Sequence, residues 1–445
     1  MIIINGKIVT WGEPNEILED KALYISEGVI QSIADQSGLI AEHPDEEILD
    51  AAGQYVMPGN ICAHTHFYGA FARGMAIPGE PPANFLQILK QLWWKLDKAL
   101  DLEAVRYSAL VCLVDAIKHG TTTLIDHHAS PNAIDGSLDV IAEAVEAAGL
   151  RASLCYEVTE RDGEACAQAG IAENQRFIKR VLADDFPSGL IKTHFGLHAS
   201  LTLSEATLDL CRQACPQEIG FHIHGAEAQI DEDDSLEKSG RRVINRLADH
   251  GILGQDSIVA HGVHLDDQEI ELLAETGTWL THQPRSNMNN AVGVAPIEKM
   301  LSKGVKVGLG NDGFSNAMWM EWKAAYLVHK LWNLDPRRMG GYDIVKIAVN
   351  NNADLITRIF NGLRVGEIKT DAAADLIFVD YLPFTPLTVG NLPWHILFGF
   401  HESMITTTIV AGKVLMHNRK LLTLDEKEIT KHAIEIAERT WQLVE

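Results

Sequence analysis

Eight short apolar runs recur along the middle of the chain, and stretches of helical periodicity separate most of them. The runs cover residues 61–66, 121–126, 151–157, 191–197, 219–225, 257–263, 278–284 and 306–312. Apolar spacing predicts helices over 102–118, 137–148, 202–214, 242–250 and 267–275, with N-caps at Ser204 and Asp266. Strands that alternate with helices in this way are typical of a (β/α)8 barrel. We therefore predict an α/β fold with a TIM-type barrel over residues 58–363.

The two flanks of the chain carry a different pattern of short strand-like runs and turns. These runs cover residues 2–9, 21–26, 29–34, 374–380, 405–410 and 413–416. Neither flank has enough strands for a stable sheet alone. We expect residues 1–57 and 364–424 to form one small β-sandwich domain, into which the barrel is inserted. Residues 425–445 are predicted to form a C-terminal helix.

Charge and cysteine usage narrow the function classes. A formal net charge of −24 argues against nucleic acid and anionic membranes as partners. The six cysteines have no CxxC spacing and indicate reduced thiols. The first residues lack the pattern of a signal peptide, and no apolar run approaches the ~18 residues of a membrane span. A cytoplasmic location is expected.

The first apolar run ends in His64-Thr65-His66. Residues i and i+2 of a strand point to the same face, so these two imidazoles can bind one metal ion together. An HxH pair alone is a weak signal, because a histidine near a strand end is more often a core or surface residue than a ligand.

The ends of the later runs strengthen the metal interpretation. They carry His224 with Glu227, then His261, His282 and Asp312. Active sites of barrel enzymes lie at the carboxyl ends of the strands, so these side chains should converge. Three imidazoles and one carboxylate suit a divalent ion such as zinc and leave a position open for water. A bound ion would lower the pKa of that water towards ~7.

Several histidines have more than one possible role. His222 and His224 lie on the same face of the fifth run, and we favour His224 as the ligand because Glu227 follows three residues later. His127 and His128 follow the second run and fit a substrate contact or a loop role equally well. The role of His282 also remains open.

Five segments together resemble the amidohydrolase superfamily: Pro58-Gly59 with His64-Thr65-His66, then 222–227, 260–264, 282–287 and 310–313. The branch they are similar to contains aminohydrolases and chlorohydrolases, among them guanine deaminase and S-adenosylhomocysteine deaminase. Residues 72–82 and 286–293 are similar to the aminohydrolase family called SsnA. The resemblance covers nearly the whole chain, including the flanking β-domain.

The resemblance implies a role for each matched position. One divalent metal ion, zinc in preference to iron, would be bound by His64, His66, His224 and Asp312. Glu227 would shuttle protons, His261 would stabilise developing charge, and Asp312 would also assist proton transfer to the leaving group. Substrate contacts are expected from His198, Trp94, Asp97 and Arg73. Asp97 takes the place of a glutamate that binds ribose in adenosine-type deaminases, and its shorter side chain argues against a nucleoside substrate.

The predicted function is hydrolytic deamination of an amino-substituted cyclic amidine by metal-bound hydroxide. The ring would be purine-, pyrimidine- or pterin-like, and the protein a homo-oligomer. Loss of chloride or an alkylamine from a triazine-like ring is the alternative chemistry, and a two-metal amide-ring hydrolase is a more distant one. An accessory subunit without catalysis is the alternative of another class, which the intact ligand, acid and base positions argue against.

Overall fold

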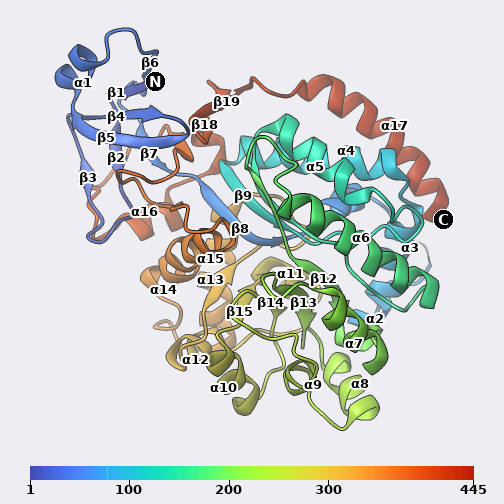
Figure 1. Cartoon of the computed structure of the whole chain (residues 1–445). Helices are drawn as coiled ribbons and strands as arrows, with labels where there is room; N and C mark the ends of the chain where they lie inside the picture. Colours follow the sequence, from blue (N-terminus) through green and yellow to red (C-terminus); the bar gives the residue numbers. More distant parts are fainter. Residues whose placement is uncertain (78, 445) are drawn as a thin grey trace.

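The middle of the chain forms two parallel sheets in the computed structural model, which describes residues 1–77 and 79–444 (Figure 1). One sheet has the order β11-β10-β9-β8 and the other the order β12-β13-β14-β15-β16. The strands are β8 (Asn60–Thr65), β9 (Thr121–Asp126), β10 (Arg151–Leu154), β11 (Ile191–Thr193), β12 (Phe195–Ala199), β13 (Phe221–Gly225), β14 (Ile258–His261), β15 (Trp279–His282) and β16 (Val307–Leu309). Each of the eight predicted runs contains at least one strand, so the predicted α/β class with parallel strands is confirmed.

Two isolated parallel bridges connect the two sheets. A parallel bridge pairs Thr65, at the end of β8, with Asp312 just after β16. On the other side, a parallel bridge pairs Val158 with Leu197 of β12. The fourth predicted run is interrupted at His194, because β11 pairs with β10 whereas β12 pairs with β13. The strand ends of both sheets therefore come close to one another.

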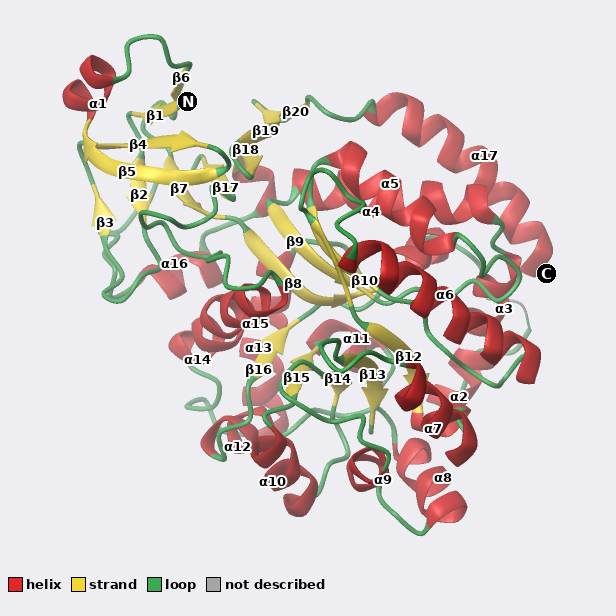
Figure 2. Cartoon of the chain, in the orientation of Figure 1, coloured by secondary structure: helices red, strands yellow, loops and turns green. Residues whose placement is uncertain are grey.

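Helices follow the strands and lie around them (Figure 2). They are α4 (Leu102–Lys118), α5 (Ser137–Ala148), α6 (Glu164–Leu182), α7 (Glu205–Ala214), α8 (Gln229–Ser239), α9 (Val243–Asp249), α10 (Asp267–Thr276), α11 (Pro284–Asn289), α12 (Ile297–Ser302), α13 (Met318–Asn333), α14 (Gly341–Val345) and α15 (Asn351–Ile359). The predicted N-caps are confirmed, since the Ser204 side chain accepts from the Thr207 amide and Asp266 forms a capping box with Glu269. Helix α6 was not predicted, because small alanines occupy many of its positions and weaken the apolar pattern.

The flanks form two further sheets, of which the four-stranded one contains N-terminal strands alone and the seven-stranded one combines strands of both flanks. Their orders are β5-β4-β1-β6 and β20-β19-β18-β17-β7-β2-β3. The strands are β1 (Ile2–Ile4), β2 (Lys7–Val9), β3 (Ile17–Leu18), β4 (Lys21–Ser26), β5 (Val29–Asp35), β6 (Ile48–Asp50), β7 (Tyr55–Pro58), β17 (Leu376–Val379), β18 (Ile405–Val410), β19 (Lys413–His417) and β20 (Lys420–Leu421). Side chains from both sheets share one buried cluster, which includes Ile3, Leu23, Val56, Phe378 and Ile409. The exact domain boundaries stay a prediction.

The remaining helices lie on the flanks and in the segment after β8. They are α1 (Gln36–Glu42), α2 (Phe85–Ile88), α3 (Trp94–Leu96), α16 (Leu392–Phe398) and α17 (Glu426–Val444). Helix α17 contains most of the predicted C-terminal helix and packs against α4, where Lys118 pairs with Glu426 at 2.6 Å. Two residues of the sequence prediction, Pro78 and Glu445, lie outside the described residues.

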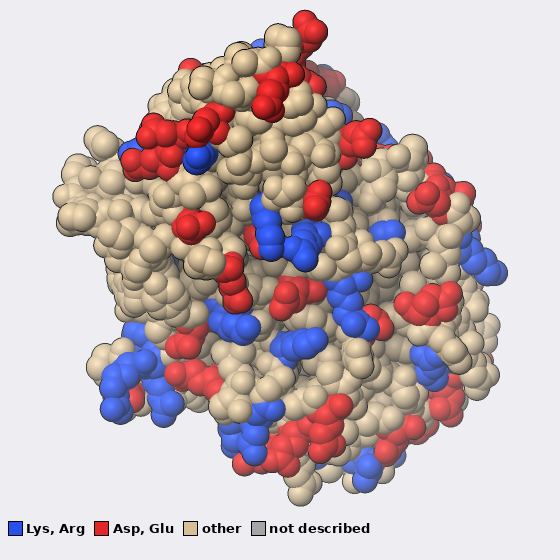
Figure 3. All heavy atoms as spheres, turned by 60° about the vertical axis from the view of Figure 1, so that its left-hand side comes forward, with Lys and Arg blue, Asp and Glu red and all other residues tan. Residues whose placement is uncertain are grey.

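Charges of both signs are interspersed on the face drawn in Figure 3, where Lys and Arg side chains lie among Asp and Glu. Within residues 1–77 and 79–444, every helix is too short or too polar to cross a bilayer.

A buried ion pair connects the start of β10 to the strand that follows Asp375. Arg151 Nε and Nη2 lie 2.9 and 3.1 Å from the two carboxylate oxygens of Asp375, and both residues are at most 3% exposed. The same carboxylate accepts from the Ala411 amide at 2.7 Å. A segment of the barrel region is thus fixed to the C-terminal flank.

Replacing Asp375 by alanine should lower the free energy of unfolding by about 3–5 kcal/mol, because it leaves a buried guanidinium without its partner. Urea denaturation measures the effect. The matched control is Asp249→Ala, which breaks a pair with Arg241 in which both side chains are about half exposed, and should cost less than about 1 kcal/mol. Equal losses in the two variants would contradict the prediction.

Candidate active site

His64 and His66 lie at the carboxyl end of β8, on one side of the strand. Their ring centroids are 4.8 Å apart, and both side chains are buried. The hydroxyl of the intervening Thr65 donates to the Asp312 carbonyl over 2.9 Å. The spacing of the HxH sequence therefore brings two imidazoles together. The intervening Thr65 pairs with Asp312, which lies just after the last strand of the other sheet.

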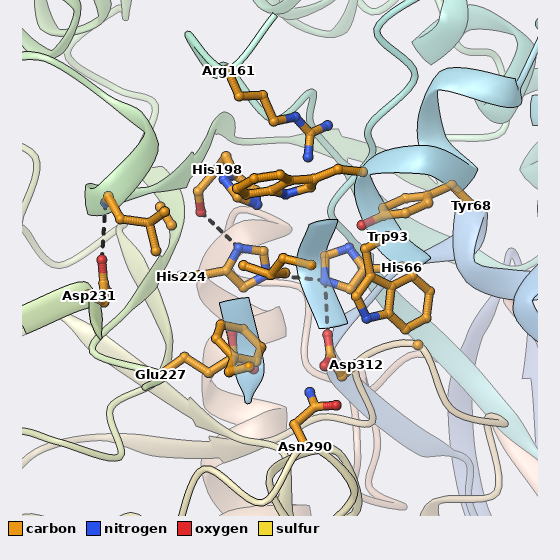
Figure 4. A pocket seen from close by; sticks show the side chains of 16 residues that line it. His66, Tyr68, Trp93, Arg161, His198, His224, Glu227, Asp231, Asn290 and Asp312 are labelled. Carbon is orange, nitrogen blue, oxygen red and sulfur yellow. Dashed lines mark hydrogen bonds and ion pairs between the residues drawn. The ribbon is translucent and has the colours of Figure 1, made fainter. Parts of the chain in front are cut away.

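Backbone carbonyls determine which nitrogen carries the proton in two of the site histidines. His66 donates from Nδ1 to the His127 carbonyl over 2.6 Å, and His224 donates from Nδ1 to the His198 carbonyl over 2.8 Å. In neutral rings the two Nε2 atoms therefore carry lone pairs, and they lie only 3.1 Å apart (Figure 4). Two facing lone pairs repel each other, so either a proton on one ring or a metal ion between them would stabilise this arrangement. Burial lowers the pKa of His66, but the carboxylates of Asp312 and Glu157 outweigh that effect and raise the pKa well above its usual range.

Asp312 adds a carboxylate to these imidazoles. Its Oδ1 lies 2.9 Å from His66 Nε2 and 3.3 Å from His64 Nε2, and its other oxygen accepts from the Ser286 hydroxyl. Burial raises the pKa of Asp312, but the neighbouring imidazoles of His64 and His66 outweigh that effect and hold the pKa well below its usual range. The carboxyl is therefore ionised at neutral pH.

The donor set fits a divalent metal ion. The buried Nε2 atom of His64 has no hydrogen-bond partner within the described part of the chain. Two overlapping groups of four donors each have their ligand atoms within 4.8 Å of one another: His64, His66, His127 and His224, and His64, His224, His261 and Asp312. Imidazole and carboxylate donors in this number suit zinc, and iron also accepts them.

Glu227 and His261 face each other beside this cluster. Glu227 Oε2 lies 3.5 Å from His261 Nε2, and His261 Nδ1 is hydrogen-bonded to the Asn287 side chain at 2.9 Å. Burial raises the pKa of Glu227 well above its usual range, and the charge of Asp312 adds to the shift. A carboxyl group with a raised pKa can take up and return a proton near neutral pH.

The pocket around these groups has an aromatic side and a polar side (Figure 4). The space between the lining residues measures about 670 Å³ when the part open to solvent is included. Tyr68, Trp93 and Trp94 come from the segment after β8, and Glu227 and Asp312 line the same pocket. Flat aromatic walls with a few polar groups suit a planar ring.

The predicted substrate contacts divide into two groups. His198 and Trp94 line the pocket, and their rings lie 6.5 Å apart in an edge-on arrangement. Asp97 lies behind the wall, where it is fully buried and forms an ion pair with Arg161, whose side chain does line the pocket. Burial raises the pKa of Asp97 to about 7, even though Arg161 opposes the shift.

Arg73, the remaining predicted substrate contact, is not among the residues that line the pocket. Its side chain is 66% exposed, and its guanidinium lies 3.9 Å from Asp115 and outside the pocket. The 3-10 helix Phe67–Ala72 turns the chain away from the site before Arg73 is reached. Spacing in the sequence alone did not indicate this turn.

Four polar residues near the site were missed by the sequence analysis. Arg161, Asp231 and Asn290 line the pocket, and Glu157 lies buried with Oε1 3.3 Å from His66 Nδ1. Glu157 ends the third apolar run and Arg161 follows in the loop after it, so their position at a strand end was the available signal.

Histidines with open roles now have defined surroundings. His224 lines the pocket, whereas His222 lies behind His64, with its Nε2 atom 2.8 Å from His64 Nδ1. His128 is hydrogen-bonded to the Ser130 hydroxyl at 2.9 Å.

His282, at the end of β15, contacts His329 of α13 rather than the pocket. The two Nε2 atoms lie 3.2 Å apart, and both residues are buried. This histidine therefore belongs to the packing between the sheet and α13.

Parallel strands whose carboxyl ends surround a buried cluster of histidines and carboxylates are typical of metal-dependent hydrolases. The chain belongs to the amidohydrolase family, whose model matches residues 55–415. The resemblance inferred from the sequence is thereby confirmed at the level of the family, and the narrower likeness to SsnA stays a prediction.

Two curated relatives match over most of their length. A 5'-deoxyadenosine deaminase of Methanosarcina mazei is 32% identical over 443 residues and covers 98% of each chain. A 5-methylthioadenosine/S-adenosylhomocysteine deaminase of Haloarcula marismortui is 33% identical and covers 89% of each. A solved structure of an adenosine deaminase from Xanthomonas campestris with bound zinc shares the fold, with a TM-score of 0.84, 23% identity and coverage of 99% of this chain and 98% of that one.

Gly310 permits the close approach of β16 to β8. A Cβ atom at this position would lie 2.7 Å from both the backbone nitrogen and the backbone oxygen of His64. Asp312 and His261 also adopt left-handed backbone angles, with φ of 59° and 76°. Such conformations cost about 1–2 kcal/mol each and cluster at functional sites.

Gly310→Ala should weaken metal binding by about 10–100-fold, because the end of β16 must move away from His64 and carry Asp312 with it. Competition with a chelator measures the affinity. Gly254→Ala is the control, since nothing lies within 4 Å of the added Cβ there. Unchanged affinity in Gly310→Ala would show that the approach does not position the carboxylate.

Proposed function

We propose that this chain is a metal-dependent aminohydrolase that replaces the amino group of an amino-substituted purine-type ring by oxygen. One observation carries the proposal: Glu227, which lines the pocket together with His66, His224 and Asp312, faces the buried His261 at 3.5 Å. Acid–base groups and metal donors thus converge on one small space. The deaminase names of both curated relatives support this chemistry.

The ligands of the proposed ion are His64, His66, His224 and Asp312. The lone pairs that face each other between His66 and His224 support this set, as does the buried and unpaired Nε2 of His64. Zinc is favoured over iron, in line with the zinc bound to the Xanthomonas protein. A bound divalent ion makes water nucleophilic at neutral pH by lowering its pKa.

The protein groups divide the proton transfers among them. A water adds to the ring carbon that carries the amino group, while Glu227 takes a proton from that water and passes it to the adjacent ring nitrogen. His261, whose Nδ1 donates to Asn287, stabilises the charge that develops on the new oxygen once its Nε2 atom also carries a proton. Asp312 assists transfer of the second water proton to the amino group, the C–N bond breaks, and ammonia leaves.

The ring is proposed to bind against the aromatic wall formed by Tyr68, Trp93 and Trp94. His198 lies at one edge of this wall, next to Trp94, and offers a ring nitrogen for a hydrogen bond. A direct contact from Asp97 is not part of the proposal, because Arg161 lies between this carboxyl and the pocket.

Further features of the prediction belong to the same proposal. The two parallel sheets would form one closed (β/α)8 barrel, which the bridges Thr65–Asp312 and Val158–Leu197 support. The two flank sheets would form a β-sandwich around their shared apolar cluster. The six free cysteines support a reducing, cytoplasmic location, and assembly as a homo-oligomer remains a prediction.

Glu227→Gln should lower the turnover of the native substrate by about 10²–10⁴-fold, because the amide cannot accept the proton of water. Metal content should stay at the wild-type value, since Glu227 is not among the proposed ligands. Glu237→Gln, on the exposed face of α8, is the matched control. Full activity of Glu227→Gln on a substrate that the wild type consumes would rule out the proposed role.

Elemental analysis of protein purified without chelator should give one zinc or iron ion per chain. His64→Ala should lose that ion, because it removes a buried ligand. Two ions per chain would favour an amide-ring hydrolase with two metals, and no ion in the wild type would favour an accessory subunit without catalysis.

The metal-loaded protein should release ammonia from amino-substituted purines and their nucleosides. An enzyme-coupled ammonia assay tests this, with chloro- and alkylamino-triazines as the comparison set. Release of chloride or alkylamine without any release of ammonia would replace the deaminase proposal by the alternative chemistry.

A further inference from the structure

Two buried side chains continue the hydrogen-bond contacts of His64 into the interior. His222 Nε2, from β13, lies 2.8 Å from His64 Nδ1, and Cys155 Sγ, next to β10, lies 3.8 Å from His222 Nδ1. Cys155 Sγ also lies 3.6 Å from the carbonyl oxygen of Asp126. His64, His222 and Cys155 are all at most 1% exposed. Polar groups so deeply buried are costly unless each donor has an acceptor.

A metal ion bound at Nε2 of His64 would determine the direction of each hydrogen bond from His64 through His222 and Cys155 to Asp126. A neutral imidazole has one N–H and one lone pair. If the Nε2 lone pair of His64 faces a metal ion, its proton is on Nδ1 and is donated to His222 Nε2. The proton of His222 is then on Nδ1 and points to the Cys155 sulfur. The Cys155 thiol in turn donates to the Asp126 carbonyl, so that every donor has an acceptor.

We propose that His222 and Cys155 are positioning residues that hold His64 in the tautomer and orientation needed to bind the metal ion. Ligating histidines generally use their second nitrogen in this way, most often with a carboxylate or a carbonyl as acceptor. Here a neutral imidazole and a thiol take that place. The inference rests on the proposed function only through the metal site, and it does not depend on the identity of the substrate.

Cys155 and His222, together with His127, could instead hold a second metal ion. Ligand atoms of His127, Cys155 and His222 lie within 4.8 Å of one another, and His127 has both ring nitrogens without a hydrogen-bond partner in the described residues. The rings of His127 and His222 stack with centroids 4.3 Å apart. Geometry alone therefore does not distinguish two ions from one.

The positions of the ring protons on His64 and His222 favour one ion over two. A second ion on His222 Nδ1 would force the proton of that ring to Nε2, where it would be donated to His64 Nδ1. The proton of His64 would then occupy Nε2, and the lone pair offered to the first ion would be lost. The two ions would thus compete for opposite tautomers of the same pair of imidazoles, so the chain of hydrogen bonds is the consistent solution.

His222→Leu and His222→Gln test the proposal by metal affinity, measured by competition with a chelator. Leucine removes the acceptor of His64, and affinity for zinc should fall about 10–100-fold. Glutamine places a side-chain oxygen near the former Nε2 position and should restore most of the loss. His329→Leu, which removes a buried histidine from its contact with His282, controls for the loss of a buried imidazole elsewhere. Wild-type affinity in a folded His222→Leu variant, or equal losses in the leucine and glutamine variants, would overturn the proposal.

Cys155→Ala keeps the test available where His222→Leu does not fold. Loss of the terminal acceptor should weaken zinc binding by a few-fold, whereas Cys211→Ala, a buried thiol on α7, should leave it unchanged. The cobalt-substituted wild type should bind one ion and lack a thiolate-to-cobalt charge-transfer band. Two ions per chain, with such a band that disappears in Cys155→Ser, would establish the second metal site instead. Because these readouts measure metal binding, a protein that binds metal normally but deaminates no ring compound would refute the proposed function alone.

Discussion

The site depends on the approach of the last parallel strand to the first. The carbonyl of His64 accepts hydrogen bonds from the amides of Asn311 and Asp312 at 3.0 and 3.1 Å, and the amide of His66 donates to the Asp312 carbonyl at 3.1 Å. These backbone bonds place a carboxylate beside two imidazoles that lie about 250 positions away in the sequence. Only a residue without a side chain fits at Gly310, where this approach is closest. The backbone bonds that join the end of β8 to the residues after β16 therefore also bring the proposed metal donors together.

Much of this arrangement was predictable because strand ends carry a strong signal. His64, His66, His224, His261 and Asp312 each follow an apolar run, and parallel strands bring their carboxyl ends to the same side. Helix bounds were predicted well where apolar periodicity and a cap coincide, as in α10 with Asp266. The sequence also favoured His224 over His222 as the metal ligand, because Glu227 follows His224 by three residues. These inferences need only local patterns and the known geometry of one fold class.

Features that depend on the path of long loops could not be predicted. Nothing local indicates that the chain turns outward before Arg73 or that Arg161 comes between Asp97 and the pocket. His261 and Asp312 adopt left-handed backbone angles, which Asp and His do more often than most residues, but no local pattern in the sequence indicated these two positions. The contacts of His222 with His64 and Cys155 connect β13 to the ends of β8 and β10, and these three strands are far apart in the sequence. Sequence spacing identified the proposed metal donors and acid–base groups, but it missed Arg161, Asp231 and Asn290 in the pocket and the supporting contacts behind it.

The supporting layer explains why so many polar side chains occupy an interior that is usually filled by branched apolar ones. His64, His222 and Cys155 lie where a barrel-type fold would normally place valine, isoleucine or leucine, and each has a polar contact within 4 Å. A buried polar network is stable only when its protons are consistently arranged. In the proposed arrangement, the tautomers that satisfy the interior are also those that turn a lone pair of His64 towards the proposed metal site. Binding of the proposed ion and satisfaction of the interior would then favour the same tautomers, which would couple the packing of the parallel sheets to the chemistry at their ends.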